Sequence, residues 1–387
     1  MKTLLLTLLL AAHVAAAPNV LVILVDDLGY ADLGVYGSTR NQTPNIDALA
    51  RSGQRMTAAY AAPLCTPTRA ALMTGRFPYK TGLGRVLFPS DNAGLNPSEH
   101  TIGEYFQSLG YNTGLVGKWH LGHQVQHLPL QHGFNFYFGV PYSNDMSPLP
   151  LIRGNDTVRD LQDNEQQFLT GWYTSEAINF MQQSQIYQEA FFLVVAHTNV
   201  HTPLYTSYRG EVEAVDASTG QLLATLDQLG IRNNTIVVLM SDNGGTVYAS
   251  NAPLRGYKGS MLEGGVRVPM IWNWPGHIPA GTNNRIASMM DLLPTLVKAA
   301  GGTVTSPVDG HNIMPMLTNA APSPYAAWRY YGISPLNVTP KLKAVRAGDY
   351  KLDRVTGRLY NLRLDPGEKR NVALANPAIV KKLKAYR

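Results

Sequence analysis

Two apolar runs of the sequence, residues 19–25 and 235–240, are each followed by side chains that offer oxygen ligands. These side chains are Asp26 and Asp27 after the first run, and Asp242 and Asn243 after the second. Because neither strand end adds a histidine or a cysteine, the set suits a hard cation, with Ca²⁺ favoured over Mg²⁺. The alternative is that these sequences, which are common in turns, are only solvated loops.

Cationic side chains follow two further apolar runs, residues 111–116 and 191–196. They are Lys118 and His120 after the first of these runs and His201 after the second, and Lys258 comes later in the chain. Such donors can hold a tetrahedral anion and protonate a leaving oxygen. A cation nearby would also make the centre of an anionic ester more electrophilic. The combination is compatible with hydrolysis of an anionic ester, and the alternative is that each of these side chains is a solvated loop residue.

Cys65 is the single cysteine of the chain, which excludes an intramolecular disulfide and a zinc site built from several thiolates. It stands just before a predicted helix over residues 67–74, whose N-terminus favours an anion. Arg69 lies in the first turn and can reach back to the same place. The alternative is a buried free cysteine that packs as a small apolar residue.

The four apolar runs alternate with helical patterns, which is typical of a parallel sheet covered on both faces. The predicted helices lie over residues 44–52, 67–74, 101–109 and 211–229, and Thr101 with Glu104 predicts a capping box at the start of the third. Because parallel strands end at one edge of the sheet, the polar residues that follow the four runs should gather there. His197 has no assigned role, and we expect it to be structural.

The pattern changes from about residue 305 to shorter pieces with more proline. Strands over 343–352 and 357–362 flank a Thr356-Gly357 turn and predict a hairpin, and a basic helix begins near Pro377. We therefore expect an α/β fold: a large mixed, mostly parallel sheet sandwiched by helices over residues 17–310, and a smaller C-terminal subdomain over 311–387 with an antiparallel sheet and a terminal helix.

The N-terminal segment has a basic start, a leucine-rich run and an alanine-rich end, which predicts a signal peptide over residues 1–16. The apolar run is shorter than the roughly 20 residues that a membrane span needs. We therefore expect a protein without stable membrane insertion that is secreted or periplasmic, or lysosomal or extracellular in a eukaryote. Four N-x-[ST] sequons, at Asn41, Asn155, Asn233 and Asn337, matter only in a host that glycosylates.

The overall composition excludes several classes. With 387 residues, 45% of them hydrophobic and 15% charged, the chain is neither disordered nor fibrous. The formal net charge is +6, but the basic residues are scattered apart from a cluster near Arg387. A diffuse positive charge favours anionic substrates and does not indicate nucleic acid.

Residues 65–76 read CTPTRAALMTGR and resemble the C-x-P-x-R signature of the type I, formylglycine-dependent sulfatases with its Leu-x-Thr-Gly-Arg tail. Thr68 departs from this pattern, in which serine or alanine is more common. The likeness covers essentially the whole mature chain. It includes PNVLVILVDDLG at 18–29, GKWHLG at 117–122, SDNGG at 241–245, Lys258 before EGGVRVP at 263–269, and LYNL at 359–362 followed by Asp365-Pro366.

This resemblance implies an alkaline-phosphatase-like fold and a sulfuric ester hydrolase related to arylsulfatase A. It also implies that a formylglycine-generating or sulfatase-maturating enzyme oxidises Cys65 to formylglycine. One hydroxyl of the hydrated aldehyde then attacks sulfur and displaces the alcohol, and the second drives the return to the aldehyde and releases sulfate. The substrate would be a sulfated carbohydrate or an aryl sulfate.

The resemblance assigns roles to individual residues as well. Asp26, Asp27, Asp242 and Asn243 match calcium ligands, with residue 65 joining them only after conversion. Arg69 matches the residue that stabilises the hydrated aldehyde, His120 the histidine beside the nucleophile, and His201 the acid for the leaving oxygen. Lys118 and Lys258 match sulfate-binding lysines, and Ser143 matches a serine of arylsulfatase A-like members.

Two other functions stay open on the sequence alone. The first is hydrolysis of a phosphate or phosphonate ester on the same fold, because phosphate and sulfate share tetrahedral geometry. The second is a catalytically silent glycan-binding protein, which would follow if Cys65 stays a thiol. The sequence offers no Walker A loop, no His-Glu-x-x-His and no Gly-x-Ser-x-Gly elbow.

Overall fold

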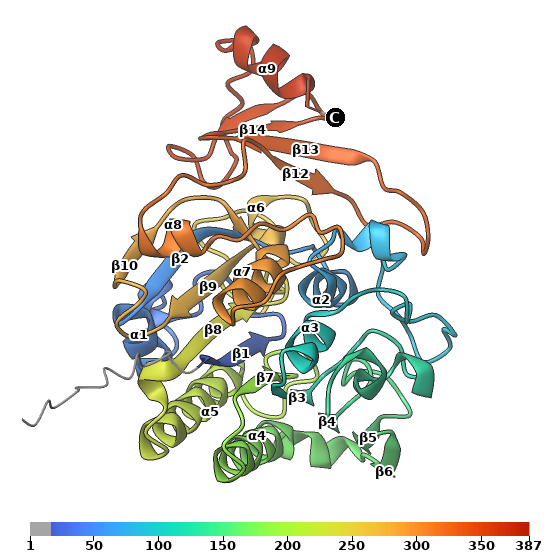
Figure 1. Ribbon diagram of the computed structural model, residues 1–387. Helices are drawn as coiled ribbons and strands as arrows, with labels where there is room; N and C mark the ends of the chain where they lie inside the picture. The colour runs from blue at the N-terminus through green and yellow to red at the C-terminus, as the bar shows by residue number, and fades with distance from the viewer. Residues whose placement is uncertain (1–16, 387) are drawn as a thin grey trace, which may run out of the picture.

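The computed structural model describes residues 17–386, so the predicted signal peptide lies outside the described residues. The described chain forms a large sheet between two layers of helices, and a small sheet that stands on one side of it (Figure 1). This architecture confirms the predicted α/β fold with a C-terminal antiparallel sheet. No helix among the described residues has the length and apolar character needed to cross a bilayer.

The large sheet has eleven strands among the described residues, in the order β10-β2-β9-β8-β1-β7-β3-β4-β5-β6, with β11 beside β2. Strands β8, β1, β7, β3 and β4 are parallel neighbours, and the antiparallel pairs β8–β9, β2–β9, β4–β5 and β5–β6 make the sheet mixed. The strand bounds are β1 Asn19–Val25, β2 Gln54–Tyr60, β3 Asn112–Gly117, β4 Phe136–Gly139, β5 Pro150–Arg153, β6 Asp156–Asp160, β7 Phe191–Ala196, β8 Thr235–Ser241, β9 Arg267–Asn273, β10 Gly281–Asn283 and β11 Ala287–Ser288.

Strand β1 is apolar from Val20 to Val25 because both faces of the sheet are covered. Its residues alternate between two cores: Val20, Val22 and Leu24 face helices α2, α3, α7 and α8, whereas Leu21 and Ile23 face α1, α4 and α5. The helix bounds are α1 Pro44–Arg51, α2 Cys65–Thr74, α3 Ile102–Ser108, α4 Leu169–Ile186, α5 Tyr208–Gln228, α6 Glu263–Val266, α7 Leu292–Ala299, α8 Met314–Thr318 and α9 Pro377–Lys384.

Helix α2 begins two residues earlier than the sequence predicted. Cys65 is its first residue rather than the residue before it. The first-turn N–H groups of a helix have no partner inside the helix, so Pro67 is tolerated in this turn and does not mark the start. The capping box predicted at the start of α3 is confirmed, because Thr101 and Glu104 each accept from the other's backbone N–H.

The small sheet is antiparallel and contains β12 Trp328–Tyr331, β13 Leu342–Ala347, β14 Tyr350–Asp353 and β15 Leu359–Asn361. The single strand predicted over 343–352 is wrong, because a two-residue turn at Gly348 and Asp349 splits it into β13 and β14. Gly348 has φ +56°, which a glycine adopts without strain. The hairpin around Thr356-Gly357 is confirmed by the antiparallel pairing of β14 and β15.

The division of the chain near residue 310 stays a prediction. Helix α8, which follows that point, packs Met316 and Leu317 into the core of the large sheet.

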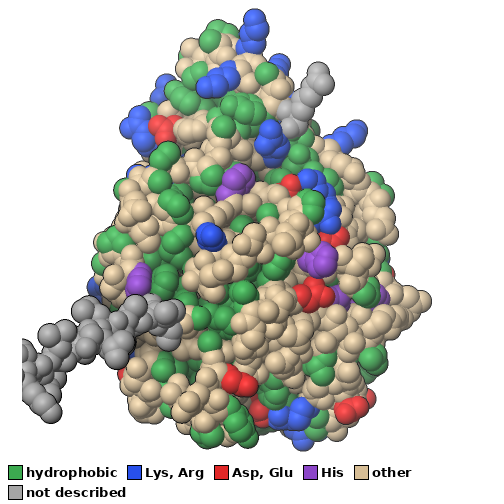
Figure 2. All heavy atoms as spheres, in the orientation of Figure 1, with side chains coloured by type: hydrophobic (Ala, Val, Ile, Leu, Met, Phe, Trp, Pro, Cys, Tyr) green, Lys and Arg blue, Asp and Glu red, His purple; other side chains and the backbone are tan. Residues whose placement is uncertain are grey.

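On the face in Figure 2, the lysine and arginine side chains of the small subdomain lie scattered among apolar and neutral ones. They do not gather there into one continuous basic patch.

A buried ionic cluster joins the small sheet to the segment that carries Lys258. Glu263 accepts hydrogen bonds from Lys351 of β14 at 3.0 Å, from the Tyr330 hydroxyl at 2.8 Å and from the Tyr60 hydroxyl at 2.7 Å. Burial would raise the pKa of Glu263, but the charges of Lys351, Arg267 and Arg346 lower it. Lys351 also donates to the Met261 carbonyl at 2.8 Å, so the cluster holds residues 261–263 in place.

We expect Lys351→Met to lower the free energy of unfolding by about 3–5 kcal/mol, because it leaves the Glu263 and Glu368 carboxylates buried without their shared cation. Denaturant unfolding measures the loss. Lys369→Met, at an exposed lysine next to Glu368, is the matched control and should change stability little. A loss as small as that of the control would show that the cluster does not hold the two parts together.

Candidate active site

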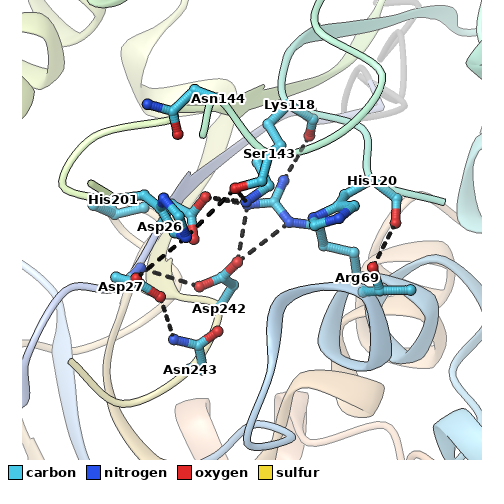
Figure 3. A network of polar contacts seen from close by, with 12 residues as sticks. Asp26, Asp27, Arg69, Lys118, His120, Ser143, Asn144, His201, Asp242 and Asn243 are labelled. Carbon is cyan, nitrogen blue, oxygen red and sulfur yellow. Dashed lines mark hydrogen bonds and ion pairs between the residues drawn. The ribbon is translucent and has the colours of Figure 1, made fainter. Parts of the chain in front are cut away.

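The predicted site residues meet at the carboxyl edge of the large sheet (Figure 3). The strand register brings them to one level: Val25 of β1 lies opposite Ser241 of β8, and Gly117 of β3 lies opposite Ala196 of β7. Asp26, Asp242 and Lys118, which follow β1, β8 and β3, therefore enter the same space, whereas β7 contributes His201 from the loop that follows it (Figure 3). At Gly117 the chain turns with φ +110°, and a Cβ there would lie 1.9 Å from the Ala196 carbonyl oxygen, so only glycine permits this approach.

Three carboxylates lie at this edge, those of Asp26, Asp27 and Asp242, and each side chain is at most 1% exposed. The backbone N–H of Asp27 donates to Asp242 Oδ1 at 3.2 Å, and Asn243 Nδ2 donates to Asp27 Oδ1 at 2.7 Å. Asp27 has φ +62°, a left-handed conformation that aspartate and asparagine tolerate better than most residues. The site thus concentrates negative charge that has little contact with water.

Arg69 neutralises part of this charge from helix α2, whose residues are all buried. Its Nη2 and Nε donate to Asp242 Oδ2 at 2.9 and 3.2 Å, and Nη2 lies 3.7 Å from Asp26 Oδ2. Its Nη1 donates to the backbone carbonyl of Lys118 at 2.5 Å. Hydrogen bonds between charged groups of this kind are stronger than neutral ones, and they fix α2 against the ends of β1, β3 and β8.

Two lysines neutralise the remaining carboxylates. Lys118 Nζ donates to Asp26 Oδ2 and, at 3.1 Å, to Ser143 Oγ. Lys258 Nζ lies 2.7 Å from Asp27 Oδ1. Burial would raise the pKa of Asp26, but the charges of Lys118, His201 and Arg69 hold it far below its usual value. Burial, followed by the charge of Asp26, raises the pKa of Asp242. The cationic side chains therefore offset the charge of Asp26 more fully than that of Asp242.

Two oxygens at this edge have the environment of cation ligands. Asp26 Oδ1 and Asn243 Oδ1 are buried, and neither accepts a hydrogen bond from any residue in the part of the chain that the structure describes. Buried polar atoms are nearly always paired in proteins, so these two need a partner that is not a side chain. Carboxylate and amide oxygens match the preference of Ca²⁺.

The potential metal ligands at this edge include a sulfur and a ring nitrogen, whereas the sequence predicted oxygen ligands. Asp26, Asp27, Cys65 and His201 each place one potential ligand atom within 4.8 Å of the others. The start of α2 and the loop after β7 bring the sulfur and the imidazole there. However, burial raises the pKa of the Cys65 thiol to about 11, and a protonated thiol is a poor ligand and a poor nucleophile.

His201 faces Ser143 as well as the carboxylate of Asp27. Its Nδ1 donates to the Thr202 carbonyl at 2.6 Å, which leaves Nε2 3.4 Å from Ser143 Oγ and 3.7 Å from Asp27 Oδ2. Nε2 therefore points into the site, toward Ser143 and Asp27. This placement fits a group that donates a proton to a leaving oxygen.

His120 is held in one tautomer beside Arg69 (Figure 3). Its Nε2 donates to the Leu87 carbonyl at 3.0 Å, so Nδ1 carries a lone pair, and it has no hydrogen-bond partner among residues 17–386. Burial, then the charges of Lys118 and Arg69, keep the pKa of His120 well below its usual value. The imidazole is therefore neutral and available as an acceptor.

Sequence reasoning missed two residues at the site. Thr66 donates to the His120 carbonyl at 3.0 Å and accepts from the Leu87 N–H at 3.2 Å. It therefore holds both the His120 backbone and the Leu87 backbone, whose carbonyl accepts from the His120 ring. Asn144 follows Ser143 and is 5% exposed. The resemblance that singled out Ser143 gave no signal for either. His197 matches its expected structural place, since it is fully buried and 3.2 Å from the Ser218 hydroxyl of α5.

Comparisons with known proteins give a consistent family. The family described as Sulfatase matches residues 18–302, and the C-terminal family described as N-sulphoglucosamine sulphohydrolase matches residues 257–385. The chain is 36% identical to N-acetylgalactosamine-6-sulfatase of Mus musculus over 89% of this chain and 73% of that protein. It is 34% identical to arylsulfatase A of Homo sapiens over 99% of this chain and 89% of that protein.

Solved structures agree. The crystal structure of Ps i-CgsB in complex with k-i-k-neocarrahexaose superposes with a TM-score of 0.86 at 33% identity, over 95% of this chain and 91% of that one. The PsFucS1 sulfatase from Pseudoalteromonas sp. gives a TM-score of 0.86 at 28% identity, over 95% of this chain and 88% of that one. The fold and the sequence therefore point to the same family.

We expect Ca²⁺ at about 100 times its Kd to stabilise the protein by about 2.7 kcal/mol, which raises Tm by about 3 °C for a chain of this size. Asp27→Asn should reduce this shift, because it removes a charged ligand while keeping a residue that tolerates the left-handed backbone. Thermal unfolding with Ca²⁺, Mg²⁺ or Zn²⁺ measures it. The control is Asp227→Asn at an exposed residue of α5. An equal shift in Asp27→Asn, or a larger shift with Zn²⁺, would contradict the oxygen-ligand assignment.

Proposed function

The chain belongs to the sulfatase family, and from that premise we propose that it cleaves the sulfate ester of a carbohydrate or an aryl alcohol with a formylglycine made from Cys65. The observation that carries the proposal is the placement of Cys65 at the first position of α2, with its sulfur within 4.8 Å of ligand atoms of Asp26, Asp27 and His201. A buried, protonated thiol has no evident use there, whereas an oxygen nucleophile would.

The cation of this proposal is Ca²⁺, held by Asp26, Asp27, Asp242 and Asn243. The unpartnered oxygens Asp26 Oδ1 and Asn243 Oδ1 support this assignment. The ion would polarise a sulfate oxygen and make the sulfur more electrophilic. Residue 65 would contribute a further oxygen ligand only after its conversion.

Residue 65 is the proposed nucleophile. Its hydrated aldehyde carries two hydroxyls on one carbon; one attacks sulfur, the S–O bond to the alcohol breaks, and the sulfate stays on the residue. Deprotonation of the second hydroxyl then re-forms the aldehyde and expels sulfate. A thiol lacks this second hydroxyl, so the reaction depends on a maturating enzyme, which is a proposed partner of the chain.

The other side chains bind the substrate and move protons. Lys118, Lys258 and Ser143 are proposed to bind the sulfate oxygens, and the contacts from Lys118 to Ser143 support a shared role. Arg69 would orient the hydrated aldehyde, since its helix also carries residue 65. His120, neutral and with a free Nδ1, would accept a proton near residue 65, and His201 would donate one to the leaving oxygen.

A predicted signal peptide over residues 1–16 supports a secreted or periplasmic protein, or a lysosomal or extracellular one in a eukaryote.

The names of the relatives support a sulfated substrate. N-acetylgalactosamine-6-sulfatase and arylsulfatase A name two substrate types, a sulfated amino sugar and an aryl sulfate. The first is a carbohydrate and the second is not. The proposed function therefore includes both substrate types, carbohydrate sulfates and aryl sulfates.

We expect mass spectrometry of the tryptic peptide with residue 65 to show an aldehyde in place of the thiol when the chain is produced together with a maturating enzyme. Activity should rise with the converted fraction. Cys65→Ala, which replaces a buried side chain by a slightly smaller one, should keep the fold and lose at least about 10³-fold in kcat/KM. Full activity in protein that carries only the thiol would refute the mechanism.

We expect 4-nitrophenyl sulfate to be hydrolysed with a kcat/KM at least about tenfold higher than 4-nitrophenyl phosphate. The sulfatase family match and the relatives named as sulfatases support this order of the two esters. The two esters share one leaving group, so the ratio of kcat/KM isolates the transferred group. A preference for phosphate would instead support a phosphate or phosphonate ester hydrolase on the same fold.

A further inference from the structure

A groove begins where the catalytic edge ends. It encloses about 1000 Å³, including the part open to solvent, and three loops line it: residues 144–149, 161–166 and 202–205. Two of these loops directly continue Ser143 and His201, the residues proposed to bind sulfate and to protonate the leaving oxygen. Whatever group leaves from the sulfur on the His201 side therefore extends toward this groove.

Asn144 presents an unused acceptor at the inner end of the groove. Its side chain is 5% exposed, and its Nδ2 donates to Gln166 Oε1 at 3.3 Å. Its Oδ1 is buried and accepts no hydrogen bond from any residue between 17 and 386. Figure 3 shows this oxygen directed toward the group formed by His201, Asp26 and Ser143. A buried acceptor without a donor is unfavourable, so it calls for a partner that the substrate supplies.

The charge along the groove runs opposite to that of the sulfate site. Its lining contains the exposed carboxylates of Asp145 and Asp163, and it contains no lysine or arginine among the described residues. Lys118, Lys258 and Arg69 lie instead in the proposed sulfate site, around the carboxylates that bind the proposed cation. A ligand that fits both ends is anionic at the sulfate and neutral beyond it.

Apolar and amide surfaces in the same groove suit a sugar ring. Leu149, Leu161 and Pro203 offer apolar contact, while Asn144, Gln166 and Thr202 offer hydrogen-bonding groups. Carbohydrates combine apolar C–H faces with hydroxyl edges, whereas a simple aryl ring would leave the polar groups without partners. The enclosed cavity volume of about 560 Å³ is that of a typical ligand pocket.

We infer that this groove binds the sugar from which the sulfate is removed, that Asn144 Oδ1 accepts a hydrogen bond from a hydroxyl of that sugar, and that Asp145 and Asp163 select a ring without a second sulfate or a carboxylate. The inference rests on the proposed function and narrows its substrate to a monosulfated, otherwise neutral saccharide. Asn144 is thus a specificity-determining residue, and Gln166 is a positioning residue that holds its amide.

The test compares three kinds of probe on the matured protein: 4-nitrophenyl sulfate, the monosulfates of galactose and N-acetylgalactosamine, and the corresponding disulfates. Asn144→Ala should lower the ratio of kcat/KM for the best monosulfate over that for 4-nitrophenyl sulfate by roughly three- to tenfold, the effect of one hydrogen bond. Gln166→Leu should lower the same ratio by less. Asn319→Ala, at an exposed asparagine far along the chain, is the matched control and should leave the ratio unchanged.

The charge of the groove is tested separately with Asp145→Asn and Asp163→Asn, each compared with the control Asp227→Asn. We expect both groove variants to raise kcat/KM for the disulfates relative to the monosulfates, and added salt to narrow this difference in the parent protein. Thermal unfolding should confirm that each variant is folded. Because each readout is a ratio between substrates, a uniform loss of stability does not change it.

Failure of this inference differs from failure of the proposed function. If the protein hydrolyses 4-nitrophenyl sulfate but Asn144→Ala lowers all substrates equally, or if disulfates are preferred, the groove does not select a neutral sugar and the inference is wrong while the sulfatase mechanism stands. If residue 65 is converted and no sulfate ester is hydrolysed, the proposed function itself fails.

Discussion

Three carboxylates buried at one edge of a sheet impose the constraint on which the rest of the site depends. Moving a carboxylate out of water costs several kcal/mol unless an opposite charge and hydrogen bonds replace the lost hydration. The opposite charge comes from three other segments of the chain, which place Arg69, Lys118 and Lys258 against the carboxylates of Asp26, Asp27 and Asp242. The burial of all of helix α2 and the glycine turn after β3 are the structural means that bring those cations close enough.

The residues proposed to react with the sulfate ester and those proposed to select the sugar lie on different parts of the structure. The charged groups stand at the ends of central strands and on a buried helix, where their positions are fixed by the sheet register. The groove that we assign to the sugar is built from the loops that follow Ser143 and His201, which the sheet does not fix to the same degree. Changes in these loops would alter the substrate while leaving the reacting centre intact.

The sequence predicted the parts of the molecule that depend on local pattern. Strand β7 and the capping box of α3 follow from an apolar run and from Thr101 with Glu104. The prediction of one strand over 343–352 is wrong because it runs through the Gly348-Asp349 dipeptide, which is typical of a two-residue hairpin turn. The sequence also could not place Asn144 or Glu263, because their significance arises from partners far away in the chain, such as Lys351, or from a missing partner.

We propose that the oxygens of Asp26, Asp27, Asp242 and Asn243, rather than the sulfur and imidazole nearby, hold the cation. Anomalous diffraction from crystals of the matured protein, combined with elemental analysis, identifies the ion and its ligands. We expect one Ca²⁺ per chain at about 2.3–2.6 Å from Asp26 Oδ1 and Asn243 Oδ1. A zinc ion bound by Cys65 Sγ and His201 Nε2 at the same place would contradict it.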